Sequence, residues 1–248
     1  MPPHSSWPLP TNQALTANPA QIDVWFVPLT VAPSKLAHFW KDLSADERQR
    51  ADQFRLDLQR HRFVVARAQL RHVLSRYLPI AAADICFEYE PLGKPRLSEN
   101  TAGGPVRFNL SKSGDVALIG VTSGRDVGID VEQVRRVADA ENIAERYFSS
   151  AESNALLRLP QSERNEAFLR LWTCKEAFLK ATGRGLSFPL DQVTICMDGG
   201  GEPRIDSTDA GTDDGPWQLA SLMPADGYLG AVATPGERHS IEYWRCPD

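Results

Sequence analysis

The sequence lacks long apolar runs, a cysteine framework and an excess of basic residues. No stretch approaches the roughly 18 to 20 apolar residues that span a bilayer, and the N-terminus lacks the basic start and apolar core of a signal peptide. The four cysteines are scattered, with no C-x-x-C pair and no histidine at metal-finger spacing, so neither a zinc site nor a disulfide framework is indicated. We therefore expect a cytoplasmic protein with reduced thiols.

The charge is slightly acidic overall but uneven along the chain. The 27 basic and 32 acidic residues give a net charge of -5, which argues against a general nucleic-acid binder, because such proteins need a clustered basic surface. Between Arg48 and Arg76, however, eight arginines are opposed only by Asp52 and Asp57. We expect this basic stretch to meet an anionic partner.

Short apolar runs separated by turn residues predict a chain that alternates between strands and helices. The capping box Ser44–Glu47 predicts a helix that continues to about residue 78, and a second capping box, Ser149–Glu152, precedes a longer helix over about 162–182. The acidic, glycine-containing segment 198–216 is expected to be a loop. Strands are predicted at 23–29, 85–89, 106–110, 116–121, 127–131, 193–197, 217–223, 228–232 and 241–244.

This order of elements predicts an α+β fold with two halves of similar size that meet near residue 125. The predicted N-terminal subdomain is 21–124 and the C-terminal subdomain is 125–248, while residues 1–20 are expected to form a flexible, proline-rich lead. A cleft between two such halves is a preferred place for a ligand.

The segment 127–132, VGIDVE, is predicted to place two carboxylates on one face of a strand. Asp130 and Glu132 would lie about 6 to 7 Å apart, from the ~3.3 Å rise per residue, and could share a magnesium ion while leaving room for water and phosphate oxygens. An amphipathic strand with a solvated acidic face explains the same pattern when this segment is taken alone.

The helix that follows carries further charged side chains. Trp172, Glu176 and Lys180 recur at helical spacing on one face, with Lys175 beside them. A surface ion pair between Glu176 and Lys180 is the simpler interpretation. The neighbouring residues are apolar nearly all round the helix, however, so this charged face is expected to line a pocket.

A third polar segment, Ser111-Lys112-Ser113-Gly114, follows an expected strand. It presents hydroxyls, backbone N–H groups and an ammonium to an anion, although a polar hairpin turn would look the same. The segment lacks the Walker pattern, which excludes an ordinary P-loop.

Taken together, these motifs resemble the Sfp-type 4'-phosphopantetheinyl transferases over about residues 44 to 190. The resemblance rests on five features in a fixed order, namely Arg62, GKP at 93–95, FNLSKS at 108–113, GIDVE at 128–132 and WTCKEAFLKATGRGL at 172–186. It implies a monomer of two similar α+β subdomains, with coenzyme A and either Mg²⁺ or Mn²⁺ bound in the cleft between them.

The resemblance also assigns roles to individual residues. It implies that Asp130, Glu132 and Glu176 form the metal site and that Lys180 contacts the pyrophosphate. The implied coenzyme A contacts are Arg62, Lys94, Ser111 and Lys112. The chain departs from the family at Lys112, where a histidine is usual; a lysine still pairs with phosphate but does not titrate near neutrality.

The reaction implied is attack by a serine of an apo acyl or peptidyl carrier protein on the β-phosphate of coenzyme A, releasing 3',5'-ADP. Asp130, Glu176 and Lys180 would be the catalytic residues, with Glu176 either a metal ligand or the group that accepts the serine proton. Two other classes stay open, a non-catalytic carrier-binding module and a magnesium-dependent enzyme acting on another pyrophosphate-containing nucleotide. The pathway served, whether fatty-acid, polyketide or nonribosomal-peptide synthesis, does not follow from the sequence.

Overall fold

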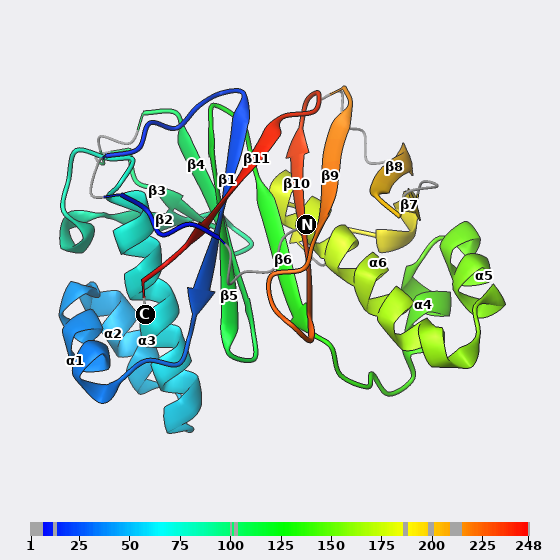
Figure 1. Cartoon of the computed structure of the whole chain (residues 1–248), viewed down its shortest axis with the longest axis horizontal. Coiled ribbons are helices and arrows are strands. Elements are labelled where there is room, and N and C mark those ends of the chain that lie inside the picture. The colour runs from blue at the N-terminus through cyan, green and yellow to red at the C-terminus, as the bar shows by residue number, and fades with distance from the viewer. Residues whose placement is uncertain are drawn as a thin grey trace.

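The computed structural model describes residues 7–11, 14–99, 101, 104–185, 188–197, 201–208 and 215–247. Its two larger sheets lie next to each other in the middle of the molecule, with helices on the two outer sides (Figure 1). The predicted α+β class is confirmed. None of the described helices has both the length and the apolarity that crossing a membrane requires.

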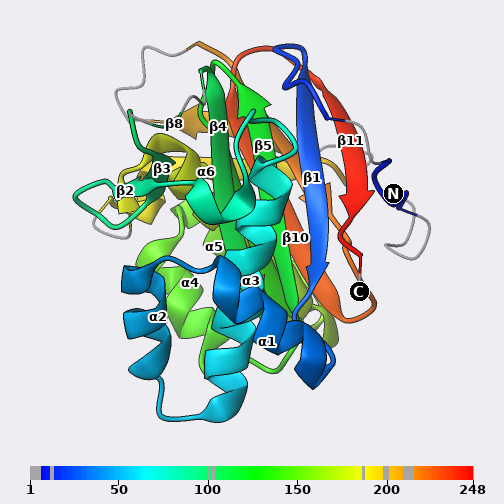
Figure 2. The same cartoon turned by 90° about the vertical axis from the view of Figure 1, so that its left-hand side faces the viewer.

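The first sheet has four strands in the order β11-β1-β5-β4. Strand β1 (Gln21–Pro28) pairs in parallel with β11 (Ser240–Arg245) and antiparallel with β5 (Val116–Ser123), which pairs with β4 (Val106–Ser113). The chain's last strand therefore belongs to the sheet of the first half, and it lies at the edge beside β1 in Figure 2. Helices α1 (Pro33–Asp42), α2 (Ala45–Asp52) and α3 (Asp57–Leu74) lie on the outer side of this sheet.

The second sheet has three antiparallel strands, with β10 (Tyr228–Pro235) between β6 (Gly128–Gln133) and β9 (Trp217–Leu222). The 22-residue helix α6 (Gln161–Thr182) packs along it, and α4 (Ala140–Tyr147) and α5 (Ser150–Arg158) lie farther out. Two hairpins complete the fold: β2 (Phe87–Tyr89) pairs with β3 (Pro95–Leu97), and β7 (Val193–Met197) pairs with β8 (Pro203–Thr208). Single 3-10 turns occur at Ala82–Asp84 and Leu190–Gln192.

Strand alternation distributes the apolar side chains among three cores. Trp25 and Val27 of β1 pack with the helices of the first half, whereas Val24 and Phe26 join Ile129 in a core between the two sheets. A third core lies between α6 and the second sheet. Since burying such side chains is the main favourable contribution to folding, the shared middle core holds the two sheets in a fixed relation.

Most predicted strands are confirmed, but three expectations about secondary structure were incomplete or wrong. The helix expected from Ser44 to about residue 78 is interrupted at 53–56, where Leu56 adopts an extended backbone before α3. Helix α1, which begins with Pro33 in its first turn, was not predicted. Within the expected loop 198–216, residues 203–208 form β8, because pairing with β7 outweighs their polar composition; 198–200 and 209–214 lie outside the described residues.

The predicted division into 1–20, 21–124 and 125–248 stays a prediction. Within the expected lead, Trp7 is only 3% exposed and its ring lies 4.8 Å from that of Tyr243 on β11, so this residue has tertiary contacts. Residues 1–6 and 12–13 lie outside the described residues.

Candidate active site

The site begins where α6 crosses β6 at Gly128. A Cβ atom at Gly128 would lie 1.9 Å from the carbonyl oxygen of Ala177 and 2.3 Å from the nitrogen of Ala181, so only glycine allows this approach. By strand alternation, Asp130 and Glu132 share the face of Gly128, while Ile129 and Val131 enter the core between the sheets. The carboxylates are thus brought beside the C-terminal half of α6.

Asp130 lies at the centre of a three-residue cluster drawn from both halves of the molecule. Its Oδ1 accepts hydrogen bonds from Ser111 Oγ on β4 at 2.8 Å and from Lys180 Nζ on α6 at 2.6 Å, and Lys180 also donates to Ser111 Oγ at 2.9 Å. The Asp130 residue is 3% exposed. Its second oxygen, Oδ2, is buried without a hydrogen-bond partner among the described residues. A buried, unsatisfied carboxylate oxygen is costly and calls for a cation or a donor.

Glu132 repeats this arrangement two residues farther along the strands. Ser113 Oγ donates to Glu132 Oε2 at 2.9 Å and accepts from the backbone N–H of Gln133 at 3.1 Å. Asn109 Oδ1 accepts the N–H of Ile129 at 2.9 Å. Alternate residues of β4 therefore fasten it to β6. Sequence reasoning missed the part played by Asn109, although the period-2 spacing of the polar residues 109, 111 and 113 was a usable signal.

Glu176 stands near this cluster and shares its electrostatics. Burial raises the pKa of Glu176; Lys180 opposes the rise, and Asp130 and Glu132 add to it. The pKa of Glu132 is also raised, first by burial, with Ser113 opposing and Asp130 adding. Lys180 thus acts on all three carboxylates, and Arg135 is a second cation that acts on Glu132.

The carboxylates of Asp130, Glu132 and Glu176 are suitable ligands for a hard divalent cation, although they are not arranged as a ready coordination shell. No group of three or more His, Cys, Asp or Glu side chains is arranged to hold a metal ion within the described part of the chain. Carboxylate oxygens are the ligands that Mg²⁺ prefers, and Asp130 Oδ2 supplies a buried oxygen without a partner among the described residues. The residues present therefore fit such an ion once Lys180 is no longer held by Asp130.

The other predicted phosphate contacts lie around the edge strand β4. Lys112 points to the opposite face from Ser111, as successive strand residues must. Burial lowers its pKa, and the nearby charges of Arg62 and Arg50 lower it further. Arg62 also pairs with Asp115, its Nη2 lying 2.6 Å from Oδ1. The structure thus gathers three cationic side chains, of which Arg50 was not singled out from the sequence. We call these three residues the basic cluster.

Lys94 lies at the C-terminal end of α6, where its Nζ donates to the carbonyl oxygen of Ala181 at 3.3 Å. Burial lowers its pKa, while Asp126 and Glu90 oppose that effect. A cation at a helix C-terminus meets the negative end of the helix dipole. Lys94 is therefore next to Lys180 along the helix and is separate from the basic cluster.

Two sequence-based interpretations prove wrong. Lys175 does not lie beside the charged face: it is 1% exposed, and its Nζ lies 2.8 Å from Glu152 Oε2 on the far side of α6 and also donates to the carbonyl oxygens of Leu190 and Val193. Arg67 and Arg71 belong to the basic stretch between Arg48 and Arg76 that was expected to meet an anionic partner. Both side chains are buried and donate to the Glu47 carboxylate, Arg67 Nε to Oε1 at 2.6 Å and Arg71 Nε to Oε2 at 2.8 Å. They therefore stabilise the fold.

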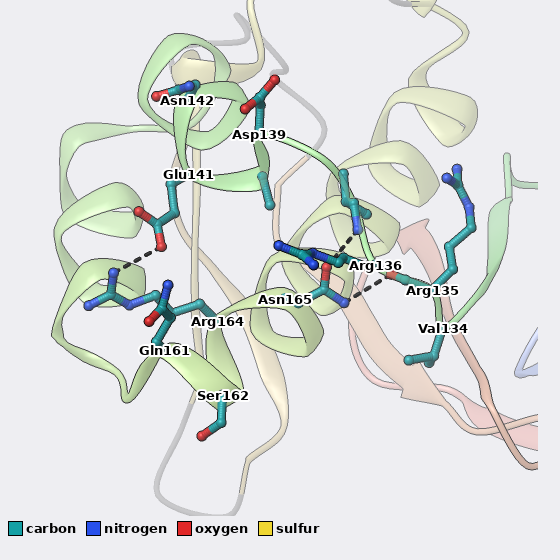
Figure 3. Close-up of a pocket in the computed structure, with 12 residues that line it drawn as sticks. Val134, Arg135, Arg136, Asp139, Glu141, Asn142, Gln161, Ser162, Arg164 and Asn165 are labelled. Atoms are coloured by element: carbon teal, nitrogen blue, oxygen red, sulfur yellow. Dashed lines mark hydrogen bonds and ion pairs between the residues drawn. The ribbon is translucent and has the colours of Figure 1, made fainter.

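A polar cavity of about 830 Å³ lies beyond the end of β6, between the loop 134–139, α4 and the start of α6. Figure 3 shows Arg135 and Arg136 on this loop, and Arg164 paired with Glu141 across the cavity at 2.9 Å. The side chain of Asn165 holds the loop at two points, donating to the carbonyl oxygen of Arg135 and accepting the N–H of Val137. The loop is therefore fixed only a few residues from Glu132.

Comparison with known proteins identifies the class. The profile of the 4'-phosphopantetheinyl transferase superfamily matches residues 126–233, and the profile of the N-terminal region of 4'-phosphopantetheinyl transferase matches residues 30–123. The 4'-phosphopantetheinyl transferase HetI of Nostoc sp. is 35% identical over 97% of this chain and 98% of its own length. The chain belongs to the 4'-phosphopantetheinyl transferase family.

Other relatives match over shorter stretches. Psf-1 of Bacillus pumilus is 33% identical over 82% of this chain and 84% of its own length. Sfp of Bacillus subtilis is 30% identical over 69% of this chain and 74% of its own length. Among solved structures, the holo-[acyl-carrier-protein] synthase of Thermotoga maritima is 29% identical, with a TM-score of 0.38 over 46% of this chain and 64% of that chain.

Proposed function

We propose that this protein transfers the 4'-phosphopantetheine group of coenzyme A to a serine of an apo acyl or peptidyl carrier protein. The observation that carries the proposal is the cluster of Ser111, Asp130 and Lys180, with Glu132 and Glu176 in electrostatic reach, in a member of this family. A hydroxyl and an ammonium can bind the oxygens of a pyrophosphate, and neighbouring carboxylates can hold the metal ion that neutralises its charge.

Asp130, Glu132 and Glu176 would hold Mg²⁺, for which Mn²⁺ could substitute. When bound, such an ion neutralises charge on the pyrophosphate and on the departing nucleotide. The partnerless Oδ2 of Asp130, judged among the described residues, supports this assignment.

Coenzyme A would be held by cations that reach it from several elements. Arg62 and Lys112, with Arg50, would bind one phosphate group, while Lys94, Lys180 and Ser111 lie toward the metal side. Ser111 and Lys112 are successive residues of β4, so the two sets of contacts would lie on its two faces. A holo-(acyl-carrier-protein) synthase of Bacillus anthracis has been solved with CoA (3',5'-ADP).

The reaction needs no nucleophile from this chain. The carrier serine oxygen attacks the β-phosphorus of coenzyme A, a new P–O bond forms, and the bond to the bridging oxygen breaks with release of 3',5'-ADP. The serine proton passes to Glu176, directly or through water, or to solvent if Glu176 is a metal ligand. The raised pKa of Glu176 suits a proton acceptor.

The carrier would dock beside the polar cavity. Carrier proteins of this type are acidic around the modified serine, and Arg135 and Arg136 offer the complementary charge on a fixed loop. The arginine-rich helix is less suited, because Arg67 and Arg71 are used internally by Glu47. Ser111 comes from the first half and Asp130 from the second, so one chain supplies both sides of the site. We therefore propose that the protein acts as a monomer. We also propose that it is cytoplasmic.

The decisive experiment incubates the protein with Mg²⁺, coenzyme A and a panel of apo carriers, and measures each carrier by mass spectrometry. We expect a mass increase of one phosphopantetheine group on at least one carrier, and equimolar 3',5'-ADP. The Asp130→Ala variant, checked for folding by circular dichroism, should give none. Unmodified carriers throughout, together with tighter binding of ATP than of coenzyme A, would overturn the proposal in favour of another nucleotide-processing enzyme.

A further inference from the structure

The ammonium of Lys180 lies where a cation bound to Asp130 would be expected. Its Nζ is 2.6 Å from Asp130 Oδ1 and 2.9 Å from Ser111 Oγ. The two partners differ in exposure: the Lys180 side chain is 29% exposed, whereas that of Asp130 is 5% exposed. A lysine ends in a compact charge on a flexible four-carbon stem, so it can leave, while the carboxylate is fixed by its strand.

The charges around this pair are unbalanced. Asp130, Glu132 and Glu176 influence one another. Lys180 is the cation that acts on Glu176, whereas Glu132 is influenced by both Arg135 and Lys180. Burying carboxylates without a counter-ion is strongly unfavourable. Without other ligands, the fold therefore uses Lys180 as its counter-charge.

We propose that Lys180 is an internal counter-ion that competes with the divalent metal for Asp130 until coenzyme A is bound. The proposal rests on the proposed function and deepens it. A divalent ion arriving alone at the carboxylate of Asp130 would be repelled by the ammonium that already lies 2.6 Å from Oδ1. When the pyrophosphate of coenzyme A arrives, Lys180 gains a second anionic partner and moves to it. Asp130 is thereby released to the metal.

Metal and coenzyme should consequently bind with positive coupling. The ammonium of Lys180 cannot pair fully with Asp130 and with the pyrophosphate at the same time. Binding of coenzyme A therefore frees Asp130 for the metal, and binding of the metal to Asp130 frees Lys180 for the pyrophosphate. Couplings of this kind typically change affinity by about 5 to 150-fold, and the effect is reciprocal. An order of binding with coenzyme first, or with both together, follows from this exchange.

The test measures Mn²⁺ binding by electron paramagnetic resonance, which does not depend on activity. In the absence of coenzyme A, Lys180→Met should bind Mn²⁺ at least about 5-fold more tightly than the wild type, because the competitor is gone. Lys180→Arg, which keeps the charge, should stay close to the wild type. Lys41→Gln removes the same charge from the exposed end of α1 and controls for net charge.

A second measurement uses only the unchanged protein. Adding coenzyme A, without any carrier protein, should tighten Mn²⁺ binding to the wild type. The same titration with Asp130→Asn reports the Mn²⁺ held by coenzyme A alone and is subtracted. Equal Mn²⁺ affinity of Lys180→Met and wild type would overturn the counter-ion role. The absence of any tightening by coenzyme A would also overturn it.

Failure of the proposed function would look different. If Asp130→Asn bound Mn²⁺ as well as the wild type did, the metal site itself would be misassigned. If Asp130→Asn lost Mn²⁺ binding while Lys180→Met gained nothing, the metal site would stand and only the counter-ion role would be lost.

Discussion

Asn109 on β4 accepts the backbone N–H of Ile129 on β6 at 2.9 Å, across the junction between the two main sheets. The Asn109 side chain is buried, so the N–H of Ile129 cannot turn to water if this acceptor is removed. One amide therefore ties the strand that carries Ser111 to the strand that carries Asp130.

Replacing Asn109 by Ala should lower the free energy of unfolding by about 1 to 3 kcal/mol, the cost of an unsatisfied buried donor. Urea denaturation followed by tryptophan fluorescence measures this loss. Asn154→Ala, on the exposed surface of α5, is the matched control and should change stability by less than about 0.5 kcal/mol. Equal stabilities of the two variants would show that the bond between the sheets contributes nothing.

The buried ion pairs of Glu47 should govern stability in acid. Burial raises the pKa of Glu47, but Arg67 and Arg71 outweigh that effect and hold it below its ordinary value of 4.5. A carboxyl whose folded pKa is depressed contributes stability that is present above its unfolded pKa and is lost as pH falls through the folded pKa. The contribution of Glu47 should thus be complete above about pH 4.5.

Glu47→Gln tests this contribution, because it leaves two buried guanidinium groups without their carboxylate. We expect a loss of about 3 to 5 kcal/mol at pH 7 and a flatter dependence of stability on pH below 4.5. Thermal unfolding from pH 3 to 7 measures both. A parallel downward shift at every pH would mean that the charge of Glu47 is not what stabilises the fold.

Lys112 should set the alkaline limit of coenzyme use. Burial, with the charges of Arg62 and Arg50, lowers its pKa from 10.5, so the free enzyme loses this cation before an exposed lysine would. The kcat/KM for coenzyme A, which reports groups of the free enzyme, should fall as pH rises through that lowered pKa. In Lys112→His the fall should move toward about pH 6.5, where imidazole titrates. An unchanged pH profile in Lys112→His would remove Lys112 from the coenzyme site.

Arg136 should contribute to binding of the carrier protein and not to binding of coenzyme A. Reversing its charge with Arg136→Glu should raise the KM for an acidic carrier about tenfold, leave the KM for coenzyme A unchanged, and weaken the dependence on salt. Steady-state kinetics at two ionic strengths check this. Arg158→Glu, exposed at the end of α5, makes the same charge change away from the cavity. Similar losses in both variants would point to overall charge and away from a docking loop.

Period-2 alternation was enough to predict most strands, and capping boxes marked the starts of α2 and α5. The candidate site was foreseen less from geometry than from the resemblance, because the sequence cannot say which strand lies beside β6. Pairing of the sheets brings Ser111 to Asp130 across 19 residues, and no local pattern encodes that contact.

The direction of charged side chains was the hardest feature to predict. Lys175 and Lys180 occupy the same helix, yet Lys175 enters the core to meet Glu152 while Lys180 reaches Asp130. Likewise, Arg67 and Arg71 appear in the sequence as part of a basic stretch, and only the position of α2 beside α3 shows that Glu47 neutralises them. Partners distant in sequence decide whether a charge serves the fold or a ligand.

The pairing of β1 with β11 has a consequence for synthesis of the protein. Residues 21–26 find their parallel partners only at residues 240–245, so the first strand made must wait for the last one. The first sheet cannot be completed before residues 240–245 have been synthesised, and until then one side of β1 exposes unpaired backbone groups. In the first sheet, the β4–β5 hairpin can therefore form during synthesis well before β11 pairs with β1, and the pairing of β11 is the step that completes this sheet.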